Sequence, residues 1–125
     1  MGARENAMVL NEYLSGAHSV DSVAHDAVFR LEGTGGRAEG REAIAAMLND
    51  FYHGTFEAHM ENVQVQGTEA GGIVECDFVG RQMREFAGMS AREDPVRVPL
   101  CVVYDMADHK IQEARIYFMS QALMR

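Results

Sequence analysis

The chain has 125 residues, the length of one ordinary domain and enough to bury a core without disulfides or metals. Apolar residues make up 47% of it and charged residues 24%, a balance typical of globular proteins. The formal net charge of −8 argues against nucleic acid and anionic membranes as partners, because both require a basic surface. We therefore expect neither a nucleic-acid partner nor a membrane partner.

The first half of the chain predicts helices around one short strand. Apolar residues at helical spacing predict a helix over Ala3–Leu14, which Gly16 ends. A second helical piece is expected over Val20–His25. Alternation then predicts a strand over Ala27–Glu32, and a strong apolar stripe predicts a helix over Glu42–His53. Helices therefore come before most of the strands.

The second half predicts a run of long strands. The segment at Ala107–Lys110 reads as a tight hairpin turn between the last two. Segregated helices and strands of this kind indicate an α+β fold, with helices packed on one face of a mostly antiparallel, curved sheet. We find no linker and expect a single domain over residues 1–125. The four expected strands are Phe56–Gln66, Gly72–Arg84, Val96–Met106 and Lys110–Ala122.

Features that report on the cellular compartment point to the cytoplasm. The N-terminal segment is amphipathic and lacks the apolar block of a signal peptide. No apolar run approaches the roughly 20 residues of a membrane span. Cys76 and Cys101 both lie in apolar, strand-like runs and read as buried thiols. We expect a cytoplasmic protein.

Four stretches, taken in order, resemble one known family. They are HDAVFRLEG (25–33), GREAIAAML (40–48), FVGRQMREFAGMSAREDPVRVP (78–99) and KIQEARIYFMSQALMR (110–125). Their order and spacing resemble the SnoaL-like branch of the nuclear-transport-factor-2-like superfamily, which includes ketosteroid isomerases and polyketide ester cyclases. The resemblance implies a cone-shaped sheet whose mouth is covered by the N-terminal helices. It also implies an apolar small-molecule ligand in the cone and a homodimer formed through the outside of the sheet.

The chain departs from this family at positions that carry chemistry. Where ester cyclases of the family have His in the central strand, this chain has Gln82. Where they have Asp in the closing strand, this chain has Met119. A Gln side chain does not titrate, and Met has no proton to move. The resemblance therefore does not carry the acid–base pair of a SnoaL-type cyclase over to this chain.

Other residues remain as candidates for catalysis. Glu32 lies close to the place of the base in ketosteroid isomerases, and burial would raise its pKa and make it a better base. Along the closing strand Glu113, Arg115 and Tyr117 share one face, which in the family looks toward the pocket. Arg115 would hold an anionic group, and Tyr117 would donate to an oxyanion. The competing interpretations are a solvated Glu32 and a structural ion pair beside a packed tyrosine.

Substrate contacts are expected from residues on several elements. Gln82 shares its strand face with Phe78 and would orient a ligand, although a mid-strand amide bound to backbone is the alternative. No histidines have metal-ligand spacing, and phosphate or dinucleotide motifs are missing, so we expect neither a metal nor a cofactor. The expected substrate-binding residues are Tyr13, His25, Phe78, Gln82, Glu113 and Met119.

Two functions remain open from the sequence. The first is a small, cofactor-free enzyme that moves a proton on an apolar, carbonyl-bearing molecule as an isomerase, cyclase or dehydratase. The second is a non-catalytic binding protein that kept the cone and lost the acid–base pair. The composition of the pocket decides between them, because a carboxylate near a tyrosine supports catalysis and a purely apolar lining supports binding.

Overall fold

The structure is a computed structural model that describes residues 2–16 and 19–124. It contains two α-helices, six strands and two short 3₁₀ turns. In these parts of the chain no helix is long and apolar enough to cross a membrane. The elements are α1 (Ala3–Ser15), η1 (Val20–Ser22), β1 (Val23–Leu31), β2 (Gly36–Glu39), α2 (Gly40–His53), β3 (Phe56–Gly67), β4 (Gly71–Gln82), β5 (Val96–Ala107), β6 (Lys110–Phe118) and η2 (Ser120–Met124).

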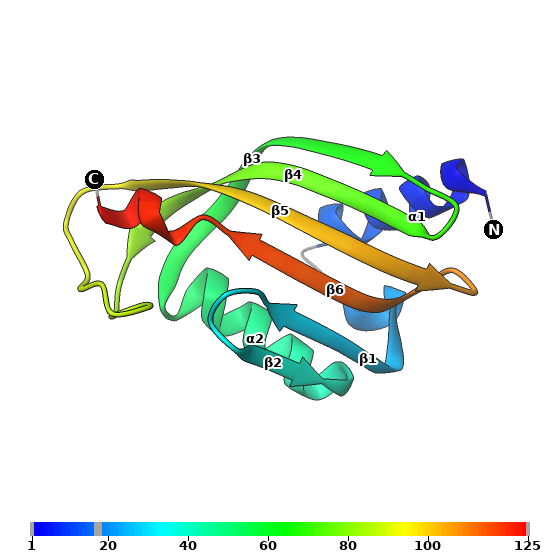
Figure 1. The fold of residues 1–125 in the computed structure, drawn as a ribbon, viewed down its shortest axis with the longest axis horizontal. Coiled ribbons are helices and arrows are strands. Elements are labelled where there is room, and N and C mark those ends of the chain that lie inside the picture. Colours follow the sequence, from blue (N-terminus) through cyan, green and yellow to red (C-terminus); the bar gives the residue numbers. More distant parts are fainter. Residues whose placement is uncertain (1, 17–18, 125) are drawn as a thin grey trace.

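All six strands belong to one sheet in the order β2-β1-β6-β5-β4-β3 (Figure 1). The β1–β6 pair is parallel, and the other neighbours are antiparallel. The sheet is strongly curved and does not close on itself, since β2 and β3 remain edge strands. The fold is thus α+β with a curved, mostly antiparallel sheet, as the sequence predicts.

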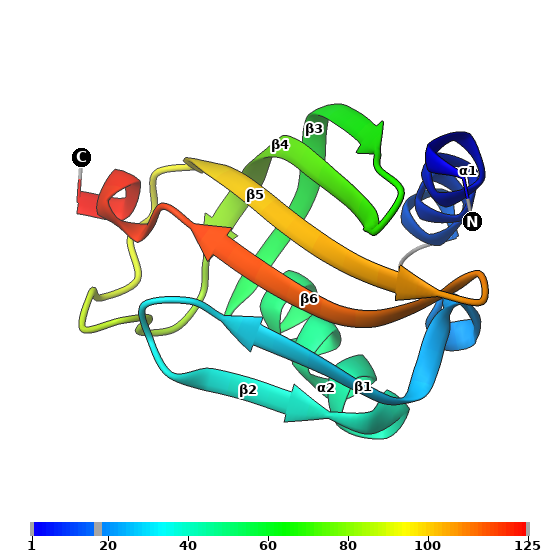
Figure 2. The same ribbon diagram turned by 45° about the vertical axis from the view of Figure 1, so that its right-hand side comes forward.

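Both helices cover the same side of the sheet, which we call the inner face (Figure 2). Helix α2 packs on β1 and β3, and α1 packs on β3 and β4. Alternate side chains along the strands are buried on this face, for example Phe78 on β4 and Val102 on β5. The opposite side, the outer face, is uncovered in the single chain.

An aromatic cluster lies on the inner face of the sheet, beside the C-terminal end of α2. Phe51 lies at its centre, with ring centroids of five other aromatic residues between 4.8 and 5.9 Å away. Edge-to-face and tilted arrangements of this kind each add stabilisation beyond the area they bury. The five neighbours are Tyr52, Phe56, Phe78, Phe86 and Phe118.

The structure differs most from the sequence-based expectation before and at the start of β1, at β2 and at the end of β6. The helical piece expected over Val20–His25 is a single 3₁₀ turn, because Val23 already pairs with Ile111 of β6. The short strand β2 was not expected, since its four residues GRAE contain only one apolar side chain. The last strand ends at Phe118 rather than Ala122, where the chain turns into η2.

The hairpin turn expected at Ala107–Lys110 is present. Asp108 and His109 have φ angles of 51° and 61°, the left-handed pair that a two-residue turn needs to match the twist of its strands. This turn sets β5 and β6 side by side from the Ala107–Lys110 pair to the Leu100–Phe118 pair. Their register in turn decides which β6 side chains face the helices.

Candidate functional site

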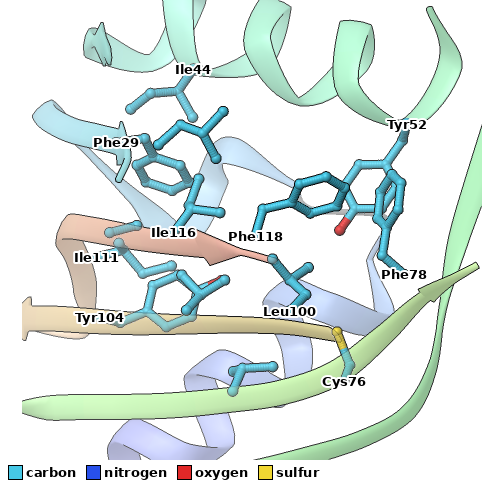
Figure 3. Close-up of a cluster of buried hydrophobic side chains, with 14 of the residues drawn as sticks. Phe29, Ile44, Tyr52, Cys76, Phe78, Leu100, Tyr104, Ile111, Ile116 and Phe118 are labelled. Carbon is cyan, nitrogen blue, oxygen red and sulfur yellow. The ribbon is translucent and has the colours of Figure 1, made fainter. Parts of the chain in front are cut away.

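A small apolar chamber lies between the helices and the inner face of the sheet. Its volume is about 30 Å³, and its walls come from α1, α2 and five strands. Most of the walls are aliphatic or phenylalanine side chains, including Phe29, Leu100 and Ile116 (Figure 3). Within residues 2–16 and 19–124, no carboxylate and no histidine lines the chamber.

Three tyrosines and a cysteine supply the polar atoms of the chamber. They are Tyr13 from α1, Tyr52 from α2, Tyr104 from β5 and Cys76 from β4. The rings of Tyr13 and Tyr104 pack edge to face with centroids 6.1 Å apart. Figure 3 shows Tyr52 reaching from α2 into the same interior as Tyr104. The chamber therefore combines an apolar wall with several weak hydrogen-bond donors.

Burial keeps these donors protonated. It raises the pKa of each of Tyr13, Tyr52 and Tyr104 well above the usual phenol range, because a phenolate would lose its hydration. Burial likewise raises the pKa of the Cys76 thiol to about 11, and the nearby Asp77 charge adds to the shift. At neutral pH all four groups are neutral, so they can donate to a carbonyl or hydroxyl oxygen but cannot serve as bases.

A larger groove lies outside the chamber, between α1, η1, α2 and β3. We call it the mouth groove, and its volume is about 760 Å³. It shares Leu14, Leu48, Tyr52 and Met60 with the chamber, so the two spaces adjoin. Small and apolar side chains form most of its walls. The mouth groove is the route by which a ligand would reach the tyrosines.

The rim of the mouth groove carries two histidines, each paired with a glutamate. His53, at the end of α2, lies 3.3 Å from Glu57, and His59 on β3 lies 2.8 Å from Glu61. Glu61 also accepts a hydrogen bond from Arg97. The hydrogen bond with His59 is the largest of the effects that lower the pKa of Glu61. These are the described titratable bases that line the groove.

The polar row of the closing strand does not lie in the chamber. Ala114, Ile116 and Phe118 are the buried residues that face the helices, so Glu113 and Arg115 lie on the outer face. Tyr117 is 45% exposed there. The expectation that this row lines an interior pocket is therefore wrong, because the alternation of β6 turns its apolar residues inward. The catalytic roles expected for Arg115 and Tyr117 stay predictions, and neither side chain lies in the interior.

Ion pairs explain why charged residues occur together on the outer face. Arg30 pairs with Glu113, and Arg115 donates to Asp105 over 2.7 Å and lies 3.6 Å from Glu113. The hydrogen bond with Asp105 is the main cause of a raised Arg115 pKa. The structural ion pair, one of the two interpretations open from the sequence, accounts for Arg115 and Glu113.

Glu32 and His25 also lie away from the chamber. Leu31 points inward and borders a second internal void, so its neighbour Glu32 points outward, 3.6 Å from Arg30. His25 is exposed, in the part of β1 where the pairing with β6 is irregular. The structure brings neither residue to the tyrosines, and their roles stay predictions.

The remaining predicted residues divide between the interior and the surface. Tyr13 lines the chamber, and Phe78 is fully buried beside it in the aromatic cluster. Gln82 is buried on the same face as Phe78, and its Nε2 atom donates to the backbone oxygens of Arg84 and Met89. That amide holds the 83–95 loop. Met119 is 55% exposed, so its expected place in an interior pocket is wrong.

Sequence reasoning missed three of the four polar groups of the chamber. Tyr52, Tyr104 and Cys76 occupy apolar positions of a helix and two strands, where they read as core. The available signal was parity: Tyr104 alternates with Val102, and Cys76 alternates with Val74 and Phe78. Three tyrosines of a four-tyrosine chain on buried faces indicate a shared interior.

No metal site is formed by the parts of the chain that the structure describes, since no three His, Cys, Asp or Glu side chains lie close enough together.

A second open groove of about 390 Å³ lies on the outer face, where Tyr117, Met119, Cys101 and Pro99 meet Glu75 and Asp77. Asn62, in a left-handed conformation at a bulge of β3, donates to Asp77 at its edge.

Comparison with solved structures places the fold. A candidate polyketide cyclase from Pseudomonas putida is 14% identical, with a TM-score of 0.79 over 98% of this chain and 96% of that one. One from Xanthomonas campestris is 18% identical, with a TM-score of 0.77 over 97% and 95%. A candidate ketosteroid isomerase from Kribbella flavida is 10% identical, with a TM-score of 0.72 over 93% and 78%. These likenesses show a shared fold.

A comparison with curated proteins found no significant match. The family model of the SnoaL-like polyketide cyclases, in contrast, matches residues 11–125, which include the C-terminal end of α1, all of α2 and the whole sheet. The chain belongs to the SnoaL-like polyketide cyclase family.

Proposed function

We propose that the chain binds an apolar, carbonyl-bearing small molecule at the mouth groove and chamber. On this proposal it moves a proton on that molecule without a cofactor, as an isomerase, cyclase or dehydratase. The observation that carries the proposal is the meeting of Tyr13, Tyr52, Tyr104 and Cys76 in an otherwise apolar chamber. Neutral donors in an apolar site stabilise a developing enolate oxygen more than they would in water.

The base would come from the mouth groove. His53 and His59 are the described bases along it, and each has a carboxylate partner that would stabilise an imidazolium. In such a reaction the base takes a proton from the carbon next to the carbonyl. The electron pair then forms the enolate, whose oxygen accepts a hydrogen bond from a tyrosine. Reprotonation at carbon completes an isomerisation or an exchange.

Hydrogen–deuterium exchange provides a direct test. We expect the protein to accelerate exchange of the acidic α-hydrogens of 2-tetralone in D₂O, followed by ¹H NMR, above the rate in buffer alone. Tyr52→Phe should slow this exchange, whereas Tyr117→Phe, on the outer face, should not. A protein that leaves the exchange at the buffer rate contradicts the proton-transfer proposal.

One observation favours a second candidate function, non-catalytic binding. No carboxylate or histidine of the described chain lines the chamber itself, so a ligand seated there would meet donors and no base. Binding of 2-naphthol with no exchange of 2-tetralone would support this alternative. The two experiments together therefore separate an enzyme from a binding protein.

We also propose a homodimer formed through the outer face, in a cytoplasmic, single-domain protein. Tyr117 and Met119 are 45% and 55% exposed there, beside Pro99 and Cys101 of the outer groove. Exposed apolar side chains gathered on one face are typical of interaction sites. Sedimentation should give a dimer at micromolar concentration, and Tyr117→Asp should shift it toward monomer. A monomeric parent protein contradicts this part of the proposal.

A further inference from the structure

Three separate spaces meet at one side chain of α2. The chamber and the mouth groove lie on two sides of Leu48, and a third space, the rear void of about 20 Å³, is bordered by Leu31, Met47 and Leu48. Phe51 and Ile116 line the chamber and the rear void but not the groove. Among the described residues, Leu48 alone lines all three spaces.

The chamber in this state is too small for a ring-shaped ligand. Its volume of about 30 Å³ suits a water molecule, whereas an engineered cavity that binds benzene measures about 150 Å³. The mouth groove is far larger, at about 760 Å³. A ligand that fills the groove therefore reaches the tyrosine hydroxyls only if the wall between groove and chamber moves.

The two ends of α2 are held, which makes a movement of the whole helix costly. At its beginning Arg41 Nε donates to the backbone oxygen of Val23 over 2.7 Å. At its end Thr55 donates through its backbone N–H to the Asp50 oxygen, and through its hydroxyl to the Asp50 carboxylate. Leu48, in contrast, is only partly buried and borders open space. Rotation of this one side chain would open the wall without moving the helix.

We infer that Leu48 is the gate of this site and sets the size of the ligand that reaches the chamber. With Leu48 across the wall, the chamber admits only a slim end of a molecule, and the bulk of the molecule stays in the mouth groove. With Leu48 turned aside or shortened, chamber, groove and rear void become one space that admits a bicyclic ring. The inference rests on the proposed ligand site and adds its size selection.

Substitutions of Leu48 in both directions test the gate. 2-Naphthol, a fluorescent bicyclic molecule with one hydroxyl group, is the probe, and its Kd is measured by fluorescence titration. Leu48→Ala should tighten binding by at least about tenfold, and Leu48→Phe should weaken it by a similar factor. Ile44→Val is the matched control, because Ile44 is buried on the same helix but lines none of the three spaces, and its Kd should stay within about twofold of the parent's. Opposite effects of the two substitutions are not expected from a residue with only a structural role.

Further readouts keep the outcomes distinct. Circular dichroism melts verify that each variant folds, and Leu48→Val replaces Leu48→Ala if the latter does not. One outcome overturns the gate and leaves the ligand site standing. In that outcome the parent binds 2-naphthol, the bound 2-naphthol protects Cys76 from alkylation, and both Leu48 variants bind with the parent's Kd. If neither the parent nor a folded Leu48→Ala protein binds 2-naphthol, both the gate and the proposed site are overturned.

Discussion

Removing the Gln82 amide tests whether that residue anchors a loop or orients a ligand. Gln82 is 3% exposed and donates to the backbone oxygens of Arg84, at 3.0 Å, and Met89, at 2.7 Å. Gln82→Met keeps the length of the side chain and removes both bonds. Each bond is worth about 0.5–1.5 kcal/mol, which makes a gross loss of about 1–3 kcal/mol.

One effect offsets part of this loss. The buried Oε1 atom of Gln82 accepts no hydrogen bond from the described residues, and the substitution removes that cost as well. We therefore expect a net loss of about 1–2 kcal/mol in the free energy of unfolding. For a domain of this size the melting temperature should fall by roughly 3–10 °C.

Two assays and one control make the test specific. Urea unfolding gives the free energy, and limited trypsin digestion should cut faster after Arg84 and Arg92 in the loosened loop. Gln112→Met on β6 is the control, with an expected change below about 0.5 kcal/mol in the free energy of unfolding. The hydrogen bond from the Gln112 side chain to the backbone oxygen of Ala107 is long, at 3.4 Å, and exposed. Unchanged stability and digestion, together with a tenfold loss of 2-naphthol binding, would refute the loop-anchor account and favour ligand contact.

The remaining predictions concern thiols, a lowered pKa and a surface position. In the monomeric Tyr117→Asp protein, iodoacetamide should label Cys101 well before Cys76, because Cys76 is buried and its pKa is raised to about 11; equal rates would contradict the place of Cys76 in the chamber. Glu61→Gln should lower the melting temperature at neutral pH. The hydrogen bond with His59 is the main cause of the lowered Glu61 pKa, so ionised Glu61 stabilises the fold above the ordinary carboxyl pKa range. This stabilisation is lost on acidification, and the difference in melting temperature between the variant and the parent should therefore vanish at low pH. At protein concentrations where the chain is monomeric, Met119→Asp should leave the melting temperature and its pH profile unchanged, because the side chain is 55% exposed in the single chain; a melting temperature that rises as the pH falls would place it in a dry site.

The closing strand shows how far sequence reasoning reaches. Its alternation correctly separates Glu113, Arg115 and Tyr117 from Ala114, Ile116 and Phe118. Which set faces the helices is a tertiary fact, and the resemblance to relatives with a polar pocket pointed to the wrong set. The apolar set is buried under α2, as burial of apolar surface requires. Side-chain parity could be predicted, but the identity of the pocket face could not.

The chamber was harder to predict because its polar atoms are the ends of mostly apolar side chains. Tyr52 and Tyr104 fit the hydrophobic periodicity of core residues, and only the packing of α2 across the inner face, on β1 and β3, brings them to the same chamber. The long strands, in contrast, followed from their apolar patterns, and the pairing of the last two followed from the hairpin turn at Ala107–Lys110. Strand β2 was missed because its four residues carry almost no apolar pattern.

The central claim is that ligand binds on the inner face, among the buried tyrosines, and not along the polar row of the outer face. The most direct measurement compares the Kd of 2-naphthol for Tyr104→Phe and Tyr117→Phe by isothermal titration calorimetry. Loss of one hydrogen bond should weaken binding roughly 3- to 10-fold for Tyr104→Phe, and Tyr117→Phe should stay within about twofold of the parent. Weaker binding by Tyr117→Phe with an unchanged Tyr104→Phe would contradict the account.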